Sequence, residues 1–138
     1  MKNAIKLILL LAAFAVAASL QAQESGIFAC EFDKFRIQHD GPTKHINGGA
    51  VMIDISKSKR TAYWGFATDH KEPFGFLYQD KNRLNGTWII VCRNPANGDI
   101  MTLHYRSSGS FIGGEIVRKR KAPDGTYRVY RTEFNRKV

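Results

Sequence analysis

The residues of this chain that could do acid–base chemistry are few. His104 and Glu115 are expected to be diagonal neighbours on one face of a predicted β-sheet, with Arg106 nearby. A histidine, a carboxylate and an arginine are the components of a ribonuclease-like acid–base site. However, a β-sheet formed by a chain with four histidines also brings such neighbours together by chance. We therefore expect binding rather than catalysis, and keep a secreted ribonuclease-like hydrolase as an alternative.

Metal and cofactor chemistry is not indicated by any motif. Asp69, His70 and Glu72 carry ligand-type side chains in one loop, but their spacing matches no common metal site. The sequence contains no glycine-rich phosphate loop and no nucleophile elbow. We therefore expect neither a cofactor nor a bound metal.

Positive charge is concentrated near the C-terminus. Residues 118–138 include eight basic and two acidic residues, with tyrosines between them. A β-hairpin tip built from this segment could contact phosphates and stack on bases or sugars. The candidate binding residues are Arg118, Lys119, Arg120, Lys121, Tyr127 and Arg128. The alternative is a solvated hairpin whose charges only prevent edge-to-edge pairing with other strands.

The first 22 residues predict a secretory signal peptide. Two lysines precede an apolar stretch at 7–20, which is short for a membrane span of about 20 residues, and Ala22 precedes a cleavage point near Gln23. The chain has 138 residues and a formal charge of +9; without 1–22, which hold two lysines and no acid, it has 116 residues and +7. We expect one exported domain at 23–138, periplasmic or secreted, not integral to the membrane after cleavage. Its charge favours an anionic macromolecule or surface as partner.

The two cysteines, Cys30 and Cys92, predict a disulfide, because an exported chain with an even number of cysteines most simply pairs them. Neither cysteine belongs to a C-x-x-C motif or has a histidine at ligand spacing. A nucleophilic or metal-binding thiol is the alternative.

The remaining sequence has the pattern of an all-β protein. Turn residues recur every eight to twelve positions between segments rich in β-branched and aromatic residues, without helical periodicity. We predict an antiparallel meander of about eight strands in a closed or partly closed barrel, with a two-layer β-sandwich as the alternative. The first strands are expected at 27–38, 50–55, 60–68, 74–79 and 83–93.

Each predicted hairpin can be paired outwards from its turn, and the resulting registers share one inner face. They place Ile53 opposite Ala62, Phe74 opposite Trp88, Cys92 opposite Met101, Tyr105 opposite Ile112, and Ile116 opposite Thr132. A small-ligand barrel, a further alternative, would hold its ligand among Trp64, Phe76, Trp88 and Tyr105.

The opposite face of the same strands is partly apolar. Ile89, Val91 and Phe111 are expected there. Either another part of the chain covers them, as in a sandwich, or they form an exposed strip for a protein partner or for self-association.

Overall fold

The structure is a computed structural model that describes residues 23–37, 44–66 and 71–137, with the backbone alone at 35–37 and 44–47. The predicted signal peptide and two predicted loop ligands, Asp69 and His70, lie outside the described residues. Within the described ranges, no helix is long and apolar enough to cross a membrane.

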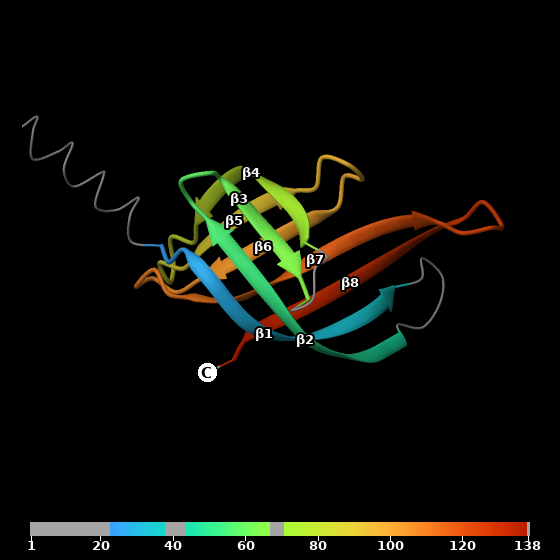
Figure 1. The fold of residues 1–138 in the computed structure, drawn as a ribbon, viewed down its shortest axis with the longest axis horizontal. Coiled ribbons are helices and arrows are strands. Elements are labelled where there is room, and N and C mark those ends of the chain that lie inside the picture. Colours follow the sequence, from blue (N-terminus) through green and yellow to red (C-terminus); the bar gives the residue numbers. More distant parts are fainter. Residues whose placement is uncertain (1–22, 38–43, 67–70, 138) are drawn as a thin grey trace, which may run out of the picture.

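The described residues form eight antiparallel strands in chain order, and the last pairs with the first to close a barrel (Figure 1). This confirms the predicted all-β meander and selects the barrel over the sandwich. The strands are β1 (Gly26–Ile37), β2 (Lys44–Ser56), β3 (Thr61–Gly65), β4 (Lys71–Lys81), β5 (Trp88–Arg93), β6 (Ile100–Tyr105), β7 (Phe111–Lys121) and β8 (Tyr127–Arg136).

The interior of the barrel is packed with side chains from its own wall. An eight-stranded barrel is just wide enough for inward-pointing side chains to fill it. The Trp64 ring lies 5.2 Å from Phe32 and 5.6 Å from Phe134, and the Tyr105 ring lies 5.7 Å from Phe111. Two of the residues predicted to contact a ligand therefore contact aromatic side chains of the core instead.

The predicted registers are correct for the β5–β6 and β7–β8 hairpins. β5 pairs with β6 as expected, with Cys92 opposite Met101, and β7 pairs with β8 with Ile116 opposite Thr132. The β2–β3 register is wrong by two residues, because Ala62 lies opposite Ile55 rather than Ile53. A shift of two preserves the side-chain alternation, so the inner face is still the predicted one.

The β4–β5 hairpin differs more from its prediction. β4 continues to Lys81, and the turn covers residues 82–87, where Asn82 N donates to Thr87 O at 2.8 Å. Phe74 and Trp88 are therefore not opposite each other, and Lys81 pairs with Trp88. Leu84, expected in a strand, is 99% exposed at this turn. The chain has turn residues both at 80–82 and at 85–86. The prediction used the first set, whereas the turn that forms is centred on the second.

The predicted disulfide is wrong, because Cys30 and Cys92 are free and buried. Cys30 lies on β1 and Cys92 on β5, which are four positions apart in either direction around the ring of strands. A disulfide needs Cα atoms within about 7 Å of each other. Opposite positions in the ring of strands do not provide the neighbouring backbones that this bond requires.

The β7–β8 hairpin extends beyond the end of the barrel (Figure 1). β6 begins at Ile100, opposite Val117, so the residues of β7 from Arg118 onward have no β6 partner. On the other side, β8 remains paired with β1 as far as Val129 opposite Ile37. We call residues 118–130 the arm. It contains all six candidate binding residues of the basic segment.

Candidate functional site

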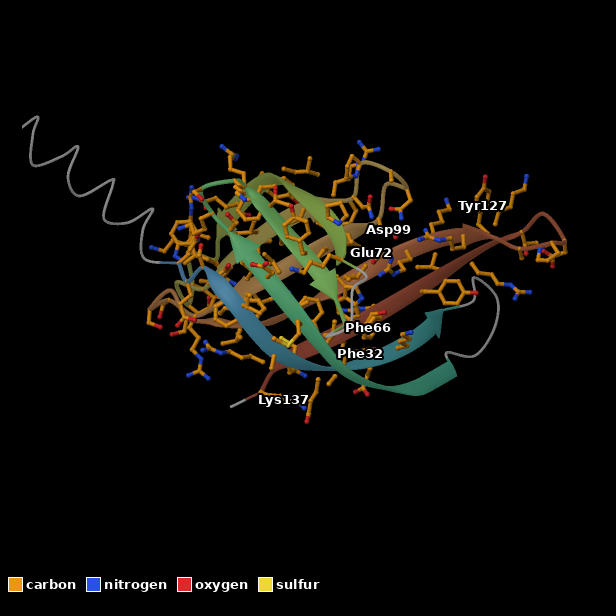
Figure 2. The ribbon with its side chains drawn as sticks, viewed as in Figure 1. Phe32, Phe66, Glu72, Asp99, Tyr127 and Lys137 are labelled. Atoms are coloured by element: carbon orange, nitrogen blue, oxygen red, sulfur yellow. The ribbon has the colours of Figure 1, made fainter. Side chains whose placement is uncertain are left out.

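The arm separates the basic run by strand alternation. Arg118 and Arg120 continue the inward-facing series of Ile116, whereas Lys119 and Lys121 point to the opposite face. Asp99 immediately precedes β6, and the start of β4 supplies Glu72. Figure 2 shows both acids at the end of the barrel where the arm begins, and Tyr127 towards the tip of the arm.

The two inward arginines are neutralised by these acids. Arg120 donates both terminal nitrogens to Asp99, at 2.6 and 2.7 Å. Arg118 donates to Asp99 at 2.8 Å and to both carboxylate oxygens of Glu72, at 2.6 and 3.1 Å. The Asp99 side chain is only 1% exposed, and its hydrogen bonds raise the pKa of Arg120 above the ordinary arginine value. These two predicted phosphate contacts therefore hold the arm to the barrel.

None of the described acids pairs with the lysines on the outward side of the arm. Lys119 Nζ lies 4.7 Å from the centre of the Tyr127 ring, and Tyr127 is 58% exposed. Lys121 is exposed, and no carboxylate of the described residues forms an ion pair with it or with Lys119. The predicted contact Arg128 does not belong to this side, because it lies directly opposite Arg120 on β8 and therefore shares the inward face; it is half-buried.

The single acid at the tip of the arm is engaged within its own turn. Asp124 accepts hydrogen bonds from the Thr126 backbone N–H at 3.0 Å and from the Thr126 hydroxyl at 2.6 Å. These bonds, more than the nearby charge of Arg128, hold the pKa of Asp124 below its ordinary value. The turn is therefore fixed locally.

The predicted apolar strip is not an open surface. Phe111 is 1% exposed inside the barrel, so its predicted outward placement is wrong. The cause is a bulge: Tyr105 pairs with Phe111, whereas His104 pairs with Gly113, so Ile112 is the residue turned outward. Val91 is only 8% exposed, and Ile89 is half-buried.

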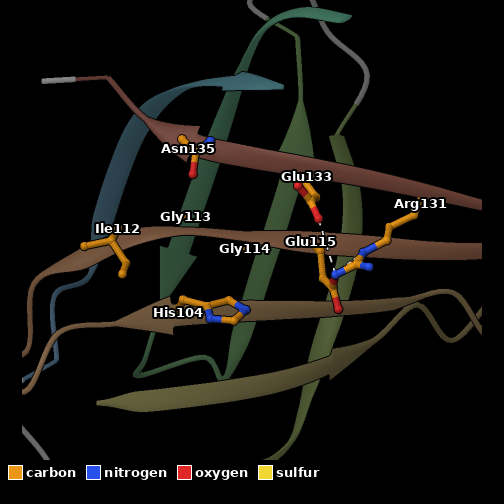
Figure 3. Close-up of a pocket in the computed structure, with 8 residues that line it drawn as sticks. All are labelled: His104, Ile112, Gly113, Gly114, Glu115, Arg131, Glu133 and Asn135. Carbon is orange, nitrogen blue, oxygen red and sulfur yellow. Dashed lines mark hydrogen bonds and ion pairs between the residues drawn. The ribbon is translucent and has the colours of Figure 1, made fainter. Parts of the chain in front are cut away.

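A groove lies on the outer wall of β6, β7 and β8, and it contains two of the three predicted acid–base residues. His104 and Glu115 both line it, but Arg106 does not. Arg106 lines a separate depression with Ser110 and Arg136. The groove has a volume of about 280 Å³. Its lining is His104, Ile112, Gly113, Gly114, Glu115, Arg131, Glu133 and Asn135 (Figure 3).

The charged end of the groove is organised by Arg131. Glu115 and Glu133 are directly opposite each other on β7 and β8, an arrangement in which like charges repel. Arg131 offsets this repulsion, since its Nε donates to Glu115 at 2.5 Å and its terminal nitrogen lies 3.3 Å from Glu133. The correct β7–β8 register could have identified Arg131 from the sequence, because it is a diagonal neighbour of Glu115.

The floor of the groove is backbone, because Gly113 and Gly114 have no side chains. A Cβ on Gly114 would lie 2.0 Å from the carbonyl oxygen of Thr102. At Gly113, φ is +143°, a region that favours glycine, and a Cβ would lie 2.3 Å from the carbonyl oxygen of Phe134. The close strand packing therefore requires both glycines, and the depression between His104 and Asn135 follows from them.

The predicted acid and base do not contact each other in the groove. Glu115 is held by Arg131, and His104 makes no hydrogen bond to Glu115 or to any other described residue. The described residues also contain no group of three or more potential metal ligands.

The two thiols lie in an apolar interior. Burial raises the pKa of Cys30 to about 11 and that of Cys92 to about 12. Thiols with such pKa values are protonated at neutral pH and are poor nucleophiles.

In comparisons with known proteins, no family model matches the sequence and no curated protein shows significant similarity to it.

Proposed function

We propose that this chain is an exported domain that binds a polyanion through the outward face of its arm, using Lys119, Lys121 and Tyr127. The proposal rests on one observation. Strand alternation leaves the two lysines without carboxylate partners among the described residues, whereas Arg118 and Arg120, which alternate with them, are neutralised by Asp99 and Glu72.

The spacing of these residues suits a ligand with repeated charges. Lys119 and Lys121 share one face of β7, so they are about 6.8 Å apart along the strand. Tyr127 lies directly opposite Lys121 on β8 and offers an exposed ring for stacking on a sugar or base. The overall excess of positive charge would speed the approach of such a ligand from any direction.

The test is the salt dependence of binding to duplex DNA and to heparin. Replacing both outward lysines, Lys119→Gln with Lys121→Gln, should reduce the slope of log K against log salt on DNA by about 1.8, since each neutralised phosphate contributes about 0.9. The matched control is Lys59→Gln with Lys81→Gln, which removes the same charge from two exposed residues away from the arm. We expect the control to retain the wild-type slope.

Two results would count against the proposal. Equal losses in the arm variant and the control would show that only net charge matters. Absence of retention on both DNA and heparin at low salt would exclude polyanion binding. Retention on heparin alone would identify a sulfated glycan rather than a nucleic acid as the ligand.

Two expectations from the sequence, export and binding rather than catalysis, have their own tests. Mass spectrometry of the protein from an exporting host should give an N-terminus near Gln23, and an intact Met1 would contradict the predicted signal peptide. A purified sample should leave RNA unchanged after long incubation. Cleavage that is lost in His104→Ala would favour the hydrolase.

A further inference from the structure

The groove on the outer wall is not part of the polyanion surface and differs from it in charge. Its lining includes the carboxylates of Glu115 and Glu133 but only one guanidinium, that of Arg131. At neutral pH these groups sum to one negative charge, on a chain whose formal charge is +9. The groove therefore disfavours the anions that the arm attracts, and it favours neutral or cationic ligands.

The shape of the groove limits the size of a ligand. His104 on β6 and Asn135 on β8 form its two sides, and the backbone of Gly113 and Gly114 forms the floor between them (Figure 3). Ile112 lies at one end, and the Glu115–Arg131–Glu133 cluster lies at the other. The volume of about 280 Å³ is just below the roughly 300 Å³ at which small-molecule sites begin. One ring fits this space better than an extended chain does.

The hydrogen-bonding groups of the groove are mostly acceptors that still have capacity. Arg131 contacts Oε2 of Glu115 and Oε1 of Glu133, which leaves the second oxygen of each carboxylate without a partner among the described residues. The side chains of His104 and Asn135 are exposed and make no hydrogen bond with the described residues. A complementary ligand must therefore carry several donors, with a positive charge near the two glutamates.

We propose that this groove binds a single amino-sugar ring. The ammonium group pairs with the free carboxylate oxygen of Glu133, and the ring hydroxyls donate to His104 and to the carbonyl oxygen of Asn135. One C–H face of the ring lies over the glycine floor and contacts Ile112, which is the one apolar side chain of the lining. This inference goes beyond the proposed function, since it uses different residues and a ligand of opposite charge.

The experiment is a titration followed by two-dimensional ¹⁵N–¹H NMR. Glucosamine, glucose and glucuronate are added separately to the protein, and the backbone amides of Gly113 and Gly114 report on the floor of the groove. We expect glucosamine to shift these two signals and the Asn135 side-chain amide most strongly, glucose to shift them weakly, and glucuronate to leave them in place.

Variants then assign the contacts. Glu133→Gln should weaken glucosamine binding about tenfold, which corresponds to about 1.4 kcal/mol, while leaving glucose binding unchanged. Asn135→Ala should weaken both sugars, and Lys121→Gln on the arm should weaken neither. Thermal melts and the dispersion of the remaining NMR signals establish that each variant is folded.

Several outcomes would overturn the proposal. These are no shift at Gly113 and Gly114 with glucosamine, equal shifts with glucuronate, or binding that Glu133→Gln leaves unaltered. If Nα-acetyl-lysine amide, which keeps its side-chain ammonium group, binds more tightly than glucosamine, the groove is instead a pocket for a basic side chain of a protein partner. None of these results bears on binding of DNA or heparin by the arm, so the two proposals fail independently.

Discussion

The inward and outward faces of the arm place the same kind of residue in opposite situations. Arg118 and Arg120 meet Asp99 and Glu72, which other hairpins bring to the end of the barrel. Lys119 and Lys121 alternate with them and meet no described carboxylate. Strand alternation therefore divides a run of four basic residues into two that pair with acids of the barrel and two that do not pair with a described acid. Basic character alone would assign all four residues to binding.

The largest expected effect is on the inward face, at Asp99. Asp99→Ala removes the shared acceptor of two arginines; because Arg118 keeps Glu72 and Arg120 is 41% exposed, we expect a loss of about 1.5–3 kcal/mol. Urea unfolding should show this as a lower midpoint with an unchanged m-value. The exposed Asp80→Ala is the control and should change the free energy of unfolding by less than about 0.5 kcal/mol. A loss below about 1 kcal/mol at Asp99 would show that the arm is not held by these pairs.

The buried thiols of Cys30 and Cys92 allow the same comparison of inward and outward positions to be made within the barrel. Since burial raises the pKa of Cys30 to about 11, its thiolate fraction at pH 8 should be about a hundredfold lower than in the unfolded chain. Iodoacetamide should modify neither cysteine in the native protein and both in urea without reductant. A protein with no modification in urea would contain a disulfide after all.

The same pKa shifts predict how the stability of the fold changes at alkaline pH. Each thiol is held protonated in the folded state, with a pKa raised from 9.0 to about 11 for Cys30 and about 12 for Cys92. This contribution to stability is fully present below about pH 9 and is lost as the pH rises through those values. Urea midpoints measured from pH 8 to pH 11 should therefore fall. Midpoints that rise over this range would contradict the shifts.

A conservative exchange distinguishes the two faces with a smaller effect. Arg118→Lys retains the charge but loses the two-point contact with Glu72, so we expect a loss of about 1–2 kcal/mol in the free energy of unfolding. Lys119→Arg on the other face should be neutral within about 0.5 kcal/mol. If both exchanges have the same effect, the geometry of the inward pairs is unimportant.

The smallest stability effect belongs to the outward lysines. Lys119→Gln with Lys121→Gln should change the free energy of unfolding by no more than about 0.5 kcal/mol, since exposed charges contribute little. The measurement is again the urea midpoint. A loss comparable with that of Asp99→Ala would place these lysines in the fold rather than on a binding face.

The sequence predicts the strand register within a hairpin better than it predicts side-chain contacts between different hairpins. The turns after β5 and β7 give correct registers, because few pairings are compatible with both the turn residues and the alternation of side chains. The bulge at Ile112 was missed, since one extra residue leaves no mark in a pattern of apolar residues. For that reason Phe111 was expected outside and lies inside.

The contacts that the sequence could not reveal are those between hairpins. Alternation alone predicts that the basic run divides between two faces, but not that Asp99 and Glu72 lie beside one of them. The cysteines illustrate the same limit, because their pairing depends on where β1 and β5 lie around the ring of strands. Two of the eight residues that line the groove, His104 and Glu115, can be predicted from the sequence, because they lie on neighbouring strands.

The pairing of β1 with β8 has a consequence for the order of assembly. Until β8 is available, the first seven strands form an open sheet with two unsatisfied edges, which can pair with other chains. Closure pairs β1 with β8, which lie far apart in the sequence, and contacts of large sequence separation form slowly. A chain truncated before Tyr127 would keep both edges open, and we expect it to self-associate rather than to fold as a smaller barrel.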